Sequence, residues 1–394
     1  MKQPGGFSPG GPKSGAAVGI LPVELPAGFA QPETDVTLWA VIFAGGIGSR
    51  FWPLSTPDRP KPLLALVSDQ TLIEDTVGRL QPTVPPERVL ILTSHDIAPA
   101  IRRVTKDVPD ENVLVEPRPL GTAAALAWGA QEVARRAGPS AMCCAIHADL
   151  AVDFPEEFRR TLRRAAAYAA RERALVSIGV RPTRPETGFG YVQPGAPLDA
   201  AHVLAKGGAQ ATLGFVEKPG EQEAIDRIAR GALWHSGVVV GAAGTFLSEL
   251  AEHTVEVRDA LEPLRNADLS AFIGLVRSTS IERGLLERTH RLLTVLGEFG
   301  WDDVGTWASL RRARDLDDDG NGAIGPVHFV DSECNVVHAE RGTVVLYGVS
   351  HMLVVSLDGL TFVTPLARAS DLNPLLDTLP GSMRIHPKQN GLSR

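Results

Sequence analysis

Residues 38–55 read LWAVIFAGGIGSRFWPLS. The first six of them are apolar and lead into the small residues Ala44, Gly45 and Gly46, which is typical of a buried strand that runs into a loop. Gly48 adds a third glycine to the loop, and glycine permits positive φ and close approach of backbone N–H groups to an anion. The stretch therefore predicts a buried strand followed by a phosphate-binding loop.

The loop and the RPKPLL sequence of residues 59–64 match neither of two common nucleotide motifs. Phe51 replaces the third glycine of a dinucleotide fingerprint, which disfavours a dehydrogenase, and no Gly-Lys-Ser/Thr follows at the P-loop spacing. Arg50 has a fork that can hold two phosphate oxygens, and Lys61, between two prolines, provides a compact charge on a restricted backbone. We expect both cations to bind phosphate. The alternative is a surface loop with incidental charges.

The basic residues of the 394-residue chain are unevenly divided, with seven lysines and 32 arginines. A lysine inside a motif is therefore less often there by chance. The formal net charge is −7, which argues against a protein that coats nucleic acid, because neutralising phosphates requires a basic face. The composition, 44% hydrophobic and 22% charged, also excludes collagen, coiled coil and wholesale disorder.

Several sequence features indicate the compartment. The three cysteines have no spacing typical of a disulfide framework or a zinc site. No apolar stretch approaches the ~18–20 residues that a membrane span requires. The short apolar run at residues 15–23 contains a proline and lacks the charged region of a signal peptide. We expect a cytoplasmic protein that binds neither membrane nor nucleic acid.

Strand-like and helix-like segments alternate after residue 37. The expected strands cover residues 38–43, 88–93, 141–146 and 174–180, and the expected helices cover residues 72–80, 97–104, 122–136 and 154–171. This order implies right-handed βαβ crossovers and an α/β fold, with a Rossmann-like, mostly parallel sheet and helices on both faces. Ligands of such sheets bind beyond the carboxyl ends of the strands, where both the glycine loop and Asp149 are expected.

Composition divides the chain into three parts. Residues 1–36, rich in Gly, Pro and Ala, predict a flexible tail. Residues 37–318 form the predicted α/β domain. Residues 319–394 predict a small C-terminal all-β module, because short β-like runs recur about every ten residues between turn residues. A Greek key, a barrel and a β-helix coil are all compatible with that spacing, and a helix is expected at residues 371–378.

The motif of residues 45–55 and 59–64 resembles that of the sugar-phosphate nucleotidyltransferases, and the likeness extends over about residues 38–310. The FWPLS sequence of residues 51–55 is similar to the mannose branch of the family. The resemblance implies a nucleotide-diphospho-sugar transferase fold and transfer of a nucleotidyl group from GTP, or another nucleoside triphosphate, to a hexose 1-phosphate. For that branch it implies mannose 1-phosphate as acceptor, Mg²⁺ as cofactor and a homodimer as one candidate assembly.

The resemblance also implies two metal ligands, Asp149 and Asp303. Asp149 follows a buried strand, and Asp303 lies in the GWDDVGTW sequence of residues 300–307. Mg²⁺ in phosphoryl transfer is typically held by one or two carboxylates plus substrate oxygens. Asp302 would lie behind the ligands at most. From local sequence alone, Asp149 could instead cap the next helix, and Asp302 and Asp303 could form a turn before one.

The family's nucleotide and catalytic residues carry over to matching positions. The resemblance implies that the nucleotide is bound by Ala44, Gly45, Gly46, Gly48, Arg50, Lys61, Glu116, Gly121, Thr122 and Ala148, and that Arg50, Lys61 and Lys218 are catalytic. Leu120 and Gly121 stand where the family usually has Arg-Asn, so recognition of guanine is less defined than recognition of a nucleotide. A small residue at this helix start could also serve packing alone.

Three segments resemble the family's sugar-phosphate site, and they imply that Gly190, Glu217, Lys218 and His235 bind the sugar phosphate. Glu217 and Lys218 belong to a Glu-Lys-Pro motif, whose glutamate accepts sugar hydroxyls and whose lysine reaches the phosphate. His235 stands where asparagine is usual. Because an imidazole offers fewer hydrogen bonds than an amide, the choice of hexose stays open here.

Two alternatives to a GTP and mannose 1-phosphate enzyme remain at this point. One is the same chemistry on another hexose- or heptose-1-phosphate and nucleoside triphosphate pair. The other is a non-catalytic regulatory subunit that senses nucleotide sugars. Such a subunit would be free to lose Arg50, Lys61 or the two aspartates, and this chain has all of them.

Overall fold

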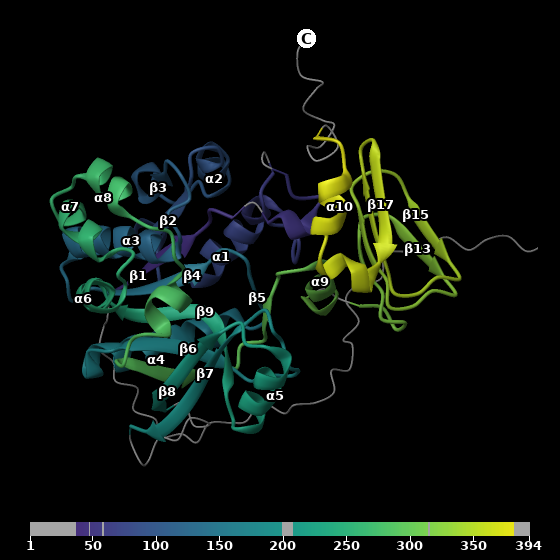
Figure 1. The fold of residues 1–394 in the computed structure, drawn as a ribbon. Coiled ribbons are helices and arrows are strands. Elements are labelled where there is room, and N and C mark those ends of the chain that lie inside the picture. Colours follow the sequence, from purple (N-terminus) through teal and green to yellow (C-terminus); the bar gives the residue numbers. More distant parts are fainter. Residues whose placement is uncertain (1–36, 47, 57–58, 199–207, 314–315, 382–394) are drawn as a thin grey trace, which may run out of the picture. The chain divides into compact units, whose positions relative to one another are not determined.

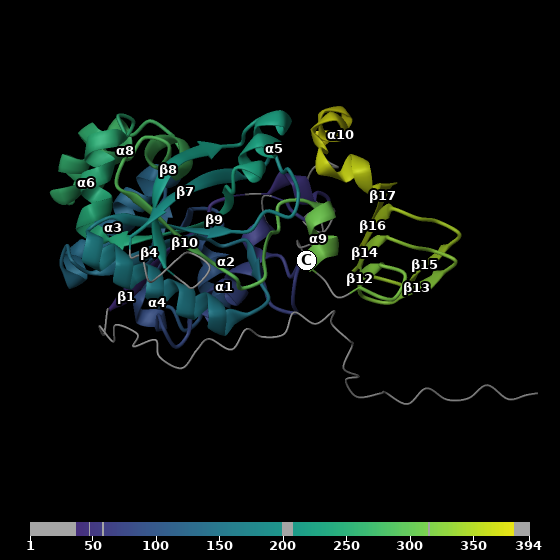
Figure 2. The same cartoon turned by 90° about the horizontal axis from the view of Figure 1, so that it is seen from below.

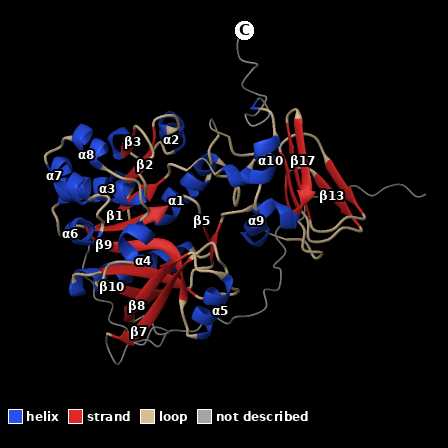
Figure 3. Cartoon of the chain, in the orientation of Figure 1, coloured by secondary structure: helices blue, strands red, loops and turns tan. Residues whose placement is uncertain are grey.

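The computed structural model describes residues 37–46, 48–56, 59–198, 208–313 and 316–381. The predicted flexible tail, residues 1–36, lies outside the described residues. Figures 1 and 3 show a large sheet with helices around it and a set of shorter strands formed by the C-terminal part of the chain. Among the described residues, no helix has the length and apolarity that crossing a bilayer would demand.

The large sheet has nine strands within the described residues. Their order is β3 (Val113–Glu116), β2 (Val89–Ser94), β1 (Leu38–Phe43), β4 (Met142–His147), β9 (Leu233–Ala242), β6 (Leu175–Val180), β10 (Leu292–Leu296), β8 (Ala209–Glu217) and β7 (Gly190–Pro197). All of them point the same way except β8 and β9, which pair antiparallel with their neighbours. The structure thus confirms the mostly parallel sheet.

Strand β1 shows why this sheet is covered on both sides. All six of its residues are buried, and because side chains alternate between the two faces of a strand, they divide between two hydrophobic clusters. Ala40 and Ile42 belong to one cluster, whereas Trp39 and Val41 belong to the other. An apolar run without polar alternation is therefore what a central strand between two layers of helices requires.

The helices divide between the two faces as predicted. One cluster includes side chains of α1 (Leu72–Leu80), α2 (Ala98–Val104), α4 (Pro155–Glu172) and α5 (Glu221–Ala229). The other includes side chains of α3 (Thr122–Ala137), α6 (Ala243–His253), α7 (Leu261–Arg265) and α8 (Leu269–Leu275). Helix α1 begins at the predicted residue because Thr71 and Glu74 form a capping box.

The C-terminal strands form two small sheets. One contains β12 (Gly322–Ile324), β14 (Val336–Ala339), β16 (Met352–Leu357) and β17 (Leu360–Pro365), and the other contains β13 (Val327–Val330) and β15 (Val344–Tyr347). Strands two apart in sequence pair in parallel, so the chain coils between two layers, as Figure 2 shows. This pairing selects the β-helix coil among the three predicted arrangements. Helix α10 (Asn373–Thr378) follows the strands.

A third hydrophobic cluster joins the glycine loop to the C-terminal strands. It contains Trp52 and Leu54 of the loop, together with Leu353 and Val355 of β16. The Trp52 ring lies 5.3 Å from that of Phe362, centroid to centroid, in an edge-on contact. The segment that carries the predicted phosphate-binding residues is therefore packed against the β module and is not a free surface loop.

Candidate active site

The glycine loop follows β1 and folds back over Lys61. The loop contains a short 3₁₀ segment, η1 (Ser49–Phe51), and a second one, η2 (Lys61–Leu63), begins at Lys61. Gly48 has a φ of +73°, and a Cβ there would lie 2.4 Å from Cβ of Lys61. The Ser55 hydroxyl donates a hydrogen bond to the Gly48 carbonyl at 2.5 Å. Glycine at position 48 is thus needed both for its backbone conformation and for contact with the lysine stem.

Lys61 is buried and contacts the first predicted metal ligand. Its side chain is 7% exposed, and its Nζ lies 2.5 Å from Oδ2 of Asp149. Burial alone would raise the pKa of Asp149, but the charge and hydrogen bond of Lys61 and the charge of His147 outweigh it and lower that pKa. The two predicted functions, phosphate binding and metal binding, therefore fall on side chains that touch each other.

A small two-stranded ladder brings the second aspartate to the first. Strand β5 (Leu150–Val152) pairs antiparallel with β11 (Trp301–Asp303), so Asp303 lies opposite Leu150, the residue after Asp149. Burial, together with the charge of Asp149, raises the pKa of Asp303 despite the opposing charges of Lys61 and Arg50. Arg50, Lys61, Asp149 and Asp303 thus form one charged group near the carboxyl ends of β1 and β4.

The donor chemistry of this group fits a divalent cation. Asp149 and Asp303 present carboxylate oxygens, which are the ligands that Mg²⁺ prefers. Burial first, and then the charge of Asp149, raises the pKa of Asp303, and a nearby positive charge such as a bound cation favours the ionised carboxylate. Asp302, by contrast, forms an ion pair with Arg312 at 2.7 Å, and its place behind the ligands stays a prediction.

The structure contradicts both local alternatives for the aspartates. The helix after Asp149 begins at Pro155, with Phe154 at its N-cap and no side-chain cap hydrogen bond. Asp302 and Asp303 lie in the strand β11 rather than in a turn, and the next helix, α9 (Trp307–Ala313), begins four residues later. Neither Asp149 nor Asp303 therefore caps a helix or forms the turn before one.

Glu116 ends β3 beside the glycine loop. A Cβ on Gly45 would lie 3.6 Å from Oε2 of Glu116. Its Oε1 is buried and has no hydrogen-bond partner among the described residues. Burial raises the pKa of Glu116 to about 7, although a backbone hydrogen bond at Leu120 lowers it in part. An unpartnered buried acceptor in this place is a candidate ligand contact, and the nucleotide-binding role of Glu116 stays a prediction.

Gly121 and Thr122 are held by a segment distant in sequence. A Cβ on Gly121 would lie 2.4 Å from the carbonyl oxygen of Thr279 and 2.7 Å from its nitrogen. The Thr122 hydroxyl accepts a hydrogen bond from the N–H of Ile281 at 2.9 Å. Packing against residues 279–281 therefore leaves no room for a side chain at position 121. Whether Gly121 and Thr122 also contact the nucleotide stays a prediction.

Ala148 lies next to Asp149, and its N–H donates a hydrogen bond to the carbonyl oxygen of Phe43.

We expect Gly121→Ala to destabilise the fold. Gly121 has φ +86° and ψ 151°, a region that is essentially restricted to glycine and costs other residues about 1–3 kcal/mol. The clash with Thr279 adds to this cost. Gly138 is a matched control, since it has φ 87° and ψ 160° and a Cβ there would meet no atom of a non-neighbouring residue within 4 Å. Urea unfolding should show a larger loss for Gly121→Ala than for Gly138→Ala; equal losses would contradict the packing argument.

The predicted sugar residues meet where β7 and β8 pair. Gly190 lies opposite Glu217 in this ladder, and a Cβ on Gly190 would lie 2.8 Å from Oε2 of Glu217. The Glu217 side chain is 9% exposed and lies 3.1 Å from Nζ of Lys218. The N–H of Glu217 donates a hydrogen bond to Oε1 of Glu287 at 2.8 Å. Lys218 itself is half exposed, so its ammonium can reach a ligand.

His235 is tied into the sheet. It is buried, and its Nδ1 lies 2.9 Å from Oγ of Ser177. Its ring packs edge-on against Phe215 at 5.3 Å between centroids. Burial lowers the pKa of His235 to about 4, so the ring is neutral near pH 7. One ring nitrogen is therefore already engaged, and a sugar contact by the other stays a prediction.

Two polar residues that the sequence reasoning did not assign also lie at this site. Nε2 of His147 is 3.7 Å from Oε1 of Glu282. His147 could have been noticed, because it lies two residues before Asp149 at the end of a predicted strand. Glu282 begins η7 (Glu282–Leu286), a π-helical turn, and nothing in its local sequence distinguishes it from a surface glutamate.

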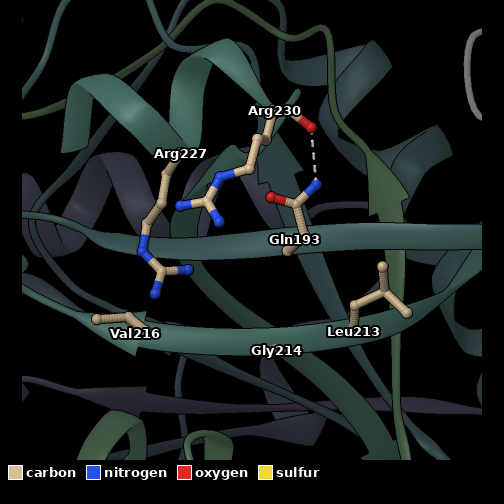
Figure 4. A pocket seen from close by; sticks show the side chains of 6 residues that line it. All are labelled: Gln193, Leu213, Gly214, Val216, Arg227 and Arg230. Carbon is tan, nitrogen blue, oxygen red and sulfur yellow. Dashed lines mark hydrogen bonds between the residues drawn. The ribbon is translucent and has the colours of Figure 1, made fainter. Parts of the chain in front are cut away.

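A separate cavity of about 450 Å³ lies between the β7–β8 hairpin and α5 (Figure 4). It is lined by Gln193, Leu213, Gly214, Val216, Arg227 and Arg230. None of the predicted site residues is among them. Because side chains alternate along β8, Val216 points away from the face of Glu217. The guanidinium of Arg227 is paired with Glu223 at 2.6 Å.

The fold and the site define an α/β protein with a glycine loop, two cations and two neighbouring carboxylates at the carboxyl ends of parallel strands. The family model for nucleotidyl transferases matches residues 39–320, and the chain belongs to this family. It is therefore a sugar-1-phosphate nucleotidyltransferase.

Individual relatives are similar over most of the chain. A mannose-1-phosphate guanylyltransferase of Escherichia coli K12 is 31% identical over 363 residues, covering 88% of this chain and 74% of the relative. One from Sinorhizobium fredii is 29% identical, covering 91% and 71%. A crystal structure from Thermus thermophilus, described as a mannose-1-phosphate geranyltransferase, superposes with a TM-score of 0.78 at 34% identity, covering 87% of this chain and 99% of its own.

Proposed function

We propose that the protein transfers a guanylyl group from GTP to mannose 1-phosphate, giving GDP-mannose and pyrophosphate. The observation that carries the proposal is the charged group of Arg50, Lys61, Asp149 and Asp303 beside the glycine loop. The names of the two similar guanylyltransferases favour this substrate pair over others.

In the proposed reaction, an oxygen of the sugar phosphate attacks the α-phosphorus of GTP in line, and pyrophosphate leaves. A phosphate monoester is already a nucleophile, so the reaction needs neither a general base nor a covalent enzyme intermediate, and catalysis consists of positioning and electrostatic stabilisation. Arg50 and the glycine loop would bind the triphosphate, and Lys61 would stabilise charge near the α-phosphate. Lys218 would orient the sugar phosphate, and the Glu217 carboxylate would accept hydrogen bonds from the sugar hydroxyls.

Mg²⁺ would be held by Asp149 and Asp303, and when bound it would neutralise the charge of the reacting phosphates. Lys61, already in contact with Asp149, would supply a further positive charge for the phosphates.

Glu116 favours a base with an exocyclic amino group. Its buried Oε1 needs a hydrogen-bond donor, and guanine, like adenine and cytosine but unlike uracil and thymine, carries such an amino group. A donor beside Oε1 would complete the hydrogen bonding of the Glu116 carboxyl group. Burial raises the pKa of this group to about 7.

The test is pyrophosphate release over a grid of nucleoside triphosphates (GTP, ATP, UTP and dTTP) and sugar phosphates (mannose, glucose and heptose 1-phosphate) with Mg²⁺. The expected result is the highest kcat/KM for GTP with mannose 1-phosphate. A higher value for another pair would replace the proposed substrates within the same chemistry. No release from any pair would favour the non-catalytic regulatory subunit.

A further inference from the structure

A partly buried carboxylate, Glu282, lies between the metal end and the sugar end of the site. Glu282 has a side chain that is 14% exposed, and its Oε1 is 3.7 Å from Nε2 of His147, whose own side chain is 31% exposed. His147 ends β4, two residues before Asp149. The partly exposed side chains of Asp149, His147 and Glu282 therefore lead from the charged group toward the sugar residues.

The His147 ring is held in place from two other directions. Its centroid lies 5.5 Å from that of Phe43 at the end of β1. Gly237 of β9 packs against its edge, since a Cβ on this glycine would lie 3.4 Å from Cδ2 of His147. With its ring packed in this way, His147 can keep the Glu282 carboxylate in one position.

The segment that carries Glu282 also organises the sugar end. Five residues after Glu282, the Glu287 carboxylate accepts the N–H of Glu217 at 2.8 Å. Burial and then the charge of Glu282 raise the pKa of Glu217, which places the two carboxylates within electrostatic reach of each other. In the proposed function, Glu217 is the residue that accepts hydrogen bonds from the sugar hydroxyls.

Glu282 has unused capacity to accept hydrogen bonds. Burial alone would raise the pKa of Glu282, but its ion-pair contact with His147 outweighs burial and lowers that pKa to about 2, so the carboxylate is ionised near pH 7. An ionised carboxylate offers about four acceptor positions. The contact with His147 and a backbone hydrogen bond occupy two of them, so positions remain for a ligand.

We propose that Glu282 is a second hydroxyl-binding carboxylate of the sugar site, with His147 as its positioning residue. This inference rests on the proposed function, because it needs the sugar of the sugar phosphate to lie beside Glu217. Recognition of the hexose is thereby assigned in part to a residue distant in sequence from the Glu-Lys-Pro motif. Glu282 would also supply a hydrogen-bonding group in place of the His235 nitrogen that is already bound to Ser177.

The first experiment compares Glu282→Gln with a matched control, Glu256→Gln. Glu256 has a similar exposure, 20%, and is likewise paired with a basic side chain, that of Arg288. Hydrogen bonds to charged groups are worth about 1.5–3 kcal/mol, so Glu282→Gln should raise KM for the sugar phosphate about tenfold or more. The KM for the nucleoside triphosphate, and both KM values of the control, should stay within about twofold of wild type.

The second experiment uses 2-, 3-, 4- and 6-deoxy analogues of the sugar phosphate. In the wild type, the analogue that lacks the hydroxyl bound by Glu282 should lose about tenfold or more in kcat/KM. In Glu282→Gln this one penalty should shrink to about twofold, while the penalties of the other analogues persist. A purely structural glutamate would not single out one hydroxyl.

The proposal is overturned if every analogue keeps its wild-type penalty in Glu282→Gln, or in Glu282→Asp where the glutamine variant does not fold. The comparison uses whichever hexose 1-phosphate the wild type turns over best. A different preferred hexose would therefore overturn the proposed substrate without deciding the role of Glu282, and unchanged penalties would overturn the role of Glu282 without deciding the substrate.

Discussion

Asp303→Asn is expected to lower Mg²⁺-dependent pyrophosphate release by about 10³-fold or more, because metal stabilisation of transition-state charge is worth several kcal/mol and each 1.36 kcal/mol is a factor of about ten. Asparagine has nearly the same shape as aspartate but lacks the charge that a divalent cation requires. The measurement is the rate of pyrophosphate release across a Mg²⁺ titration.

The fold should survive this substitution. Asp303 is placed by the backbone pairing of β11 with β5, to which its side chain does not contribute. Its charge is already unfavourable, because burial and the nearby charge of Asp149 raise its pKa. Mg²⁺ should raise Tm in the wild type but not in Asp303→Asn, since a ligand stabilises only the state that binds it. Asp302→Asn, which loses an ion pair with Arg312, is the control on the same strand. Wild-type turnover in Asp303→Asn would reject the metal assignment.

Lys61→Met is expected to lower kcat by about 10²–10³-fold, the usual loss when one preorganised electrostatic donor is removed. Methionine keeps much of the apolar stem that packs against Gly48 but removes the ammonium group. The variant should also be less stable, because Asp149 loses the cation that lies 2.5 Å away and an unpaired, partly buried charge is unfavourable. Pyrophosphate release and urea unfolding are measured together.

A double variant separates the two effects. Lys61→Met with Asp149→Asn removes both charges, so it should recover part of the stability that the single variant loses, with no recovery of activity. Lys106, which is exposed, provides a control in Lys106→Met. Near-normal kcat in a folded Lys61→Met protein would contradict the catalytic role of Lys61.

The elements of the fold could largely be predicted from local pattern. The apolar run of β1 and the periodicity and cap of α1 specify a buried strand and an amphipathic helix wherever they occur. The direction of β9 could not be predicted, because an apolar strand has the same pattern whether it pairs parallel or antiparallel with β4. Likewise, turn spacing was compatible with three β architectures, and only the parallel pairing of β14 with β16 distinguished them.

The candidate site shows the same division. The glycine loop and Lys61 could be found from motif spacing, because the chemistry of a phosphate loop is concentrated in one short segment. That Asp149 and Asp303 lie together depends on the β5–β11 ladder, and local sequence left both open to a structural explanation. Glu282 was not predicted at all, because only its tertiary contact with His147 distinguishes it from a surface glutamate.

The acidic, lysine-poor sequence thus specified a phosphate-handling α/β protein, because strand and helix periodicity and the spacing of glycines and cations act over a few neighbouring residues. Packing between distant segments settled the rest. It required glycine at position 121 through the crowding by Thr279, it buried Lys61 against Asp149, and it set Glu282 beside His147. Such contacts depend on how the elements assemble, and local sequence does not encode the position of a partner far along the chain.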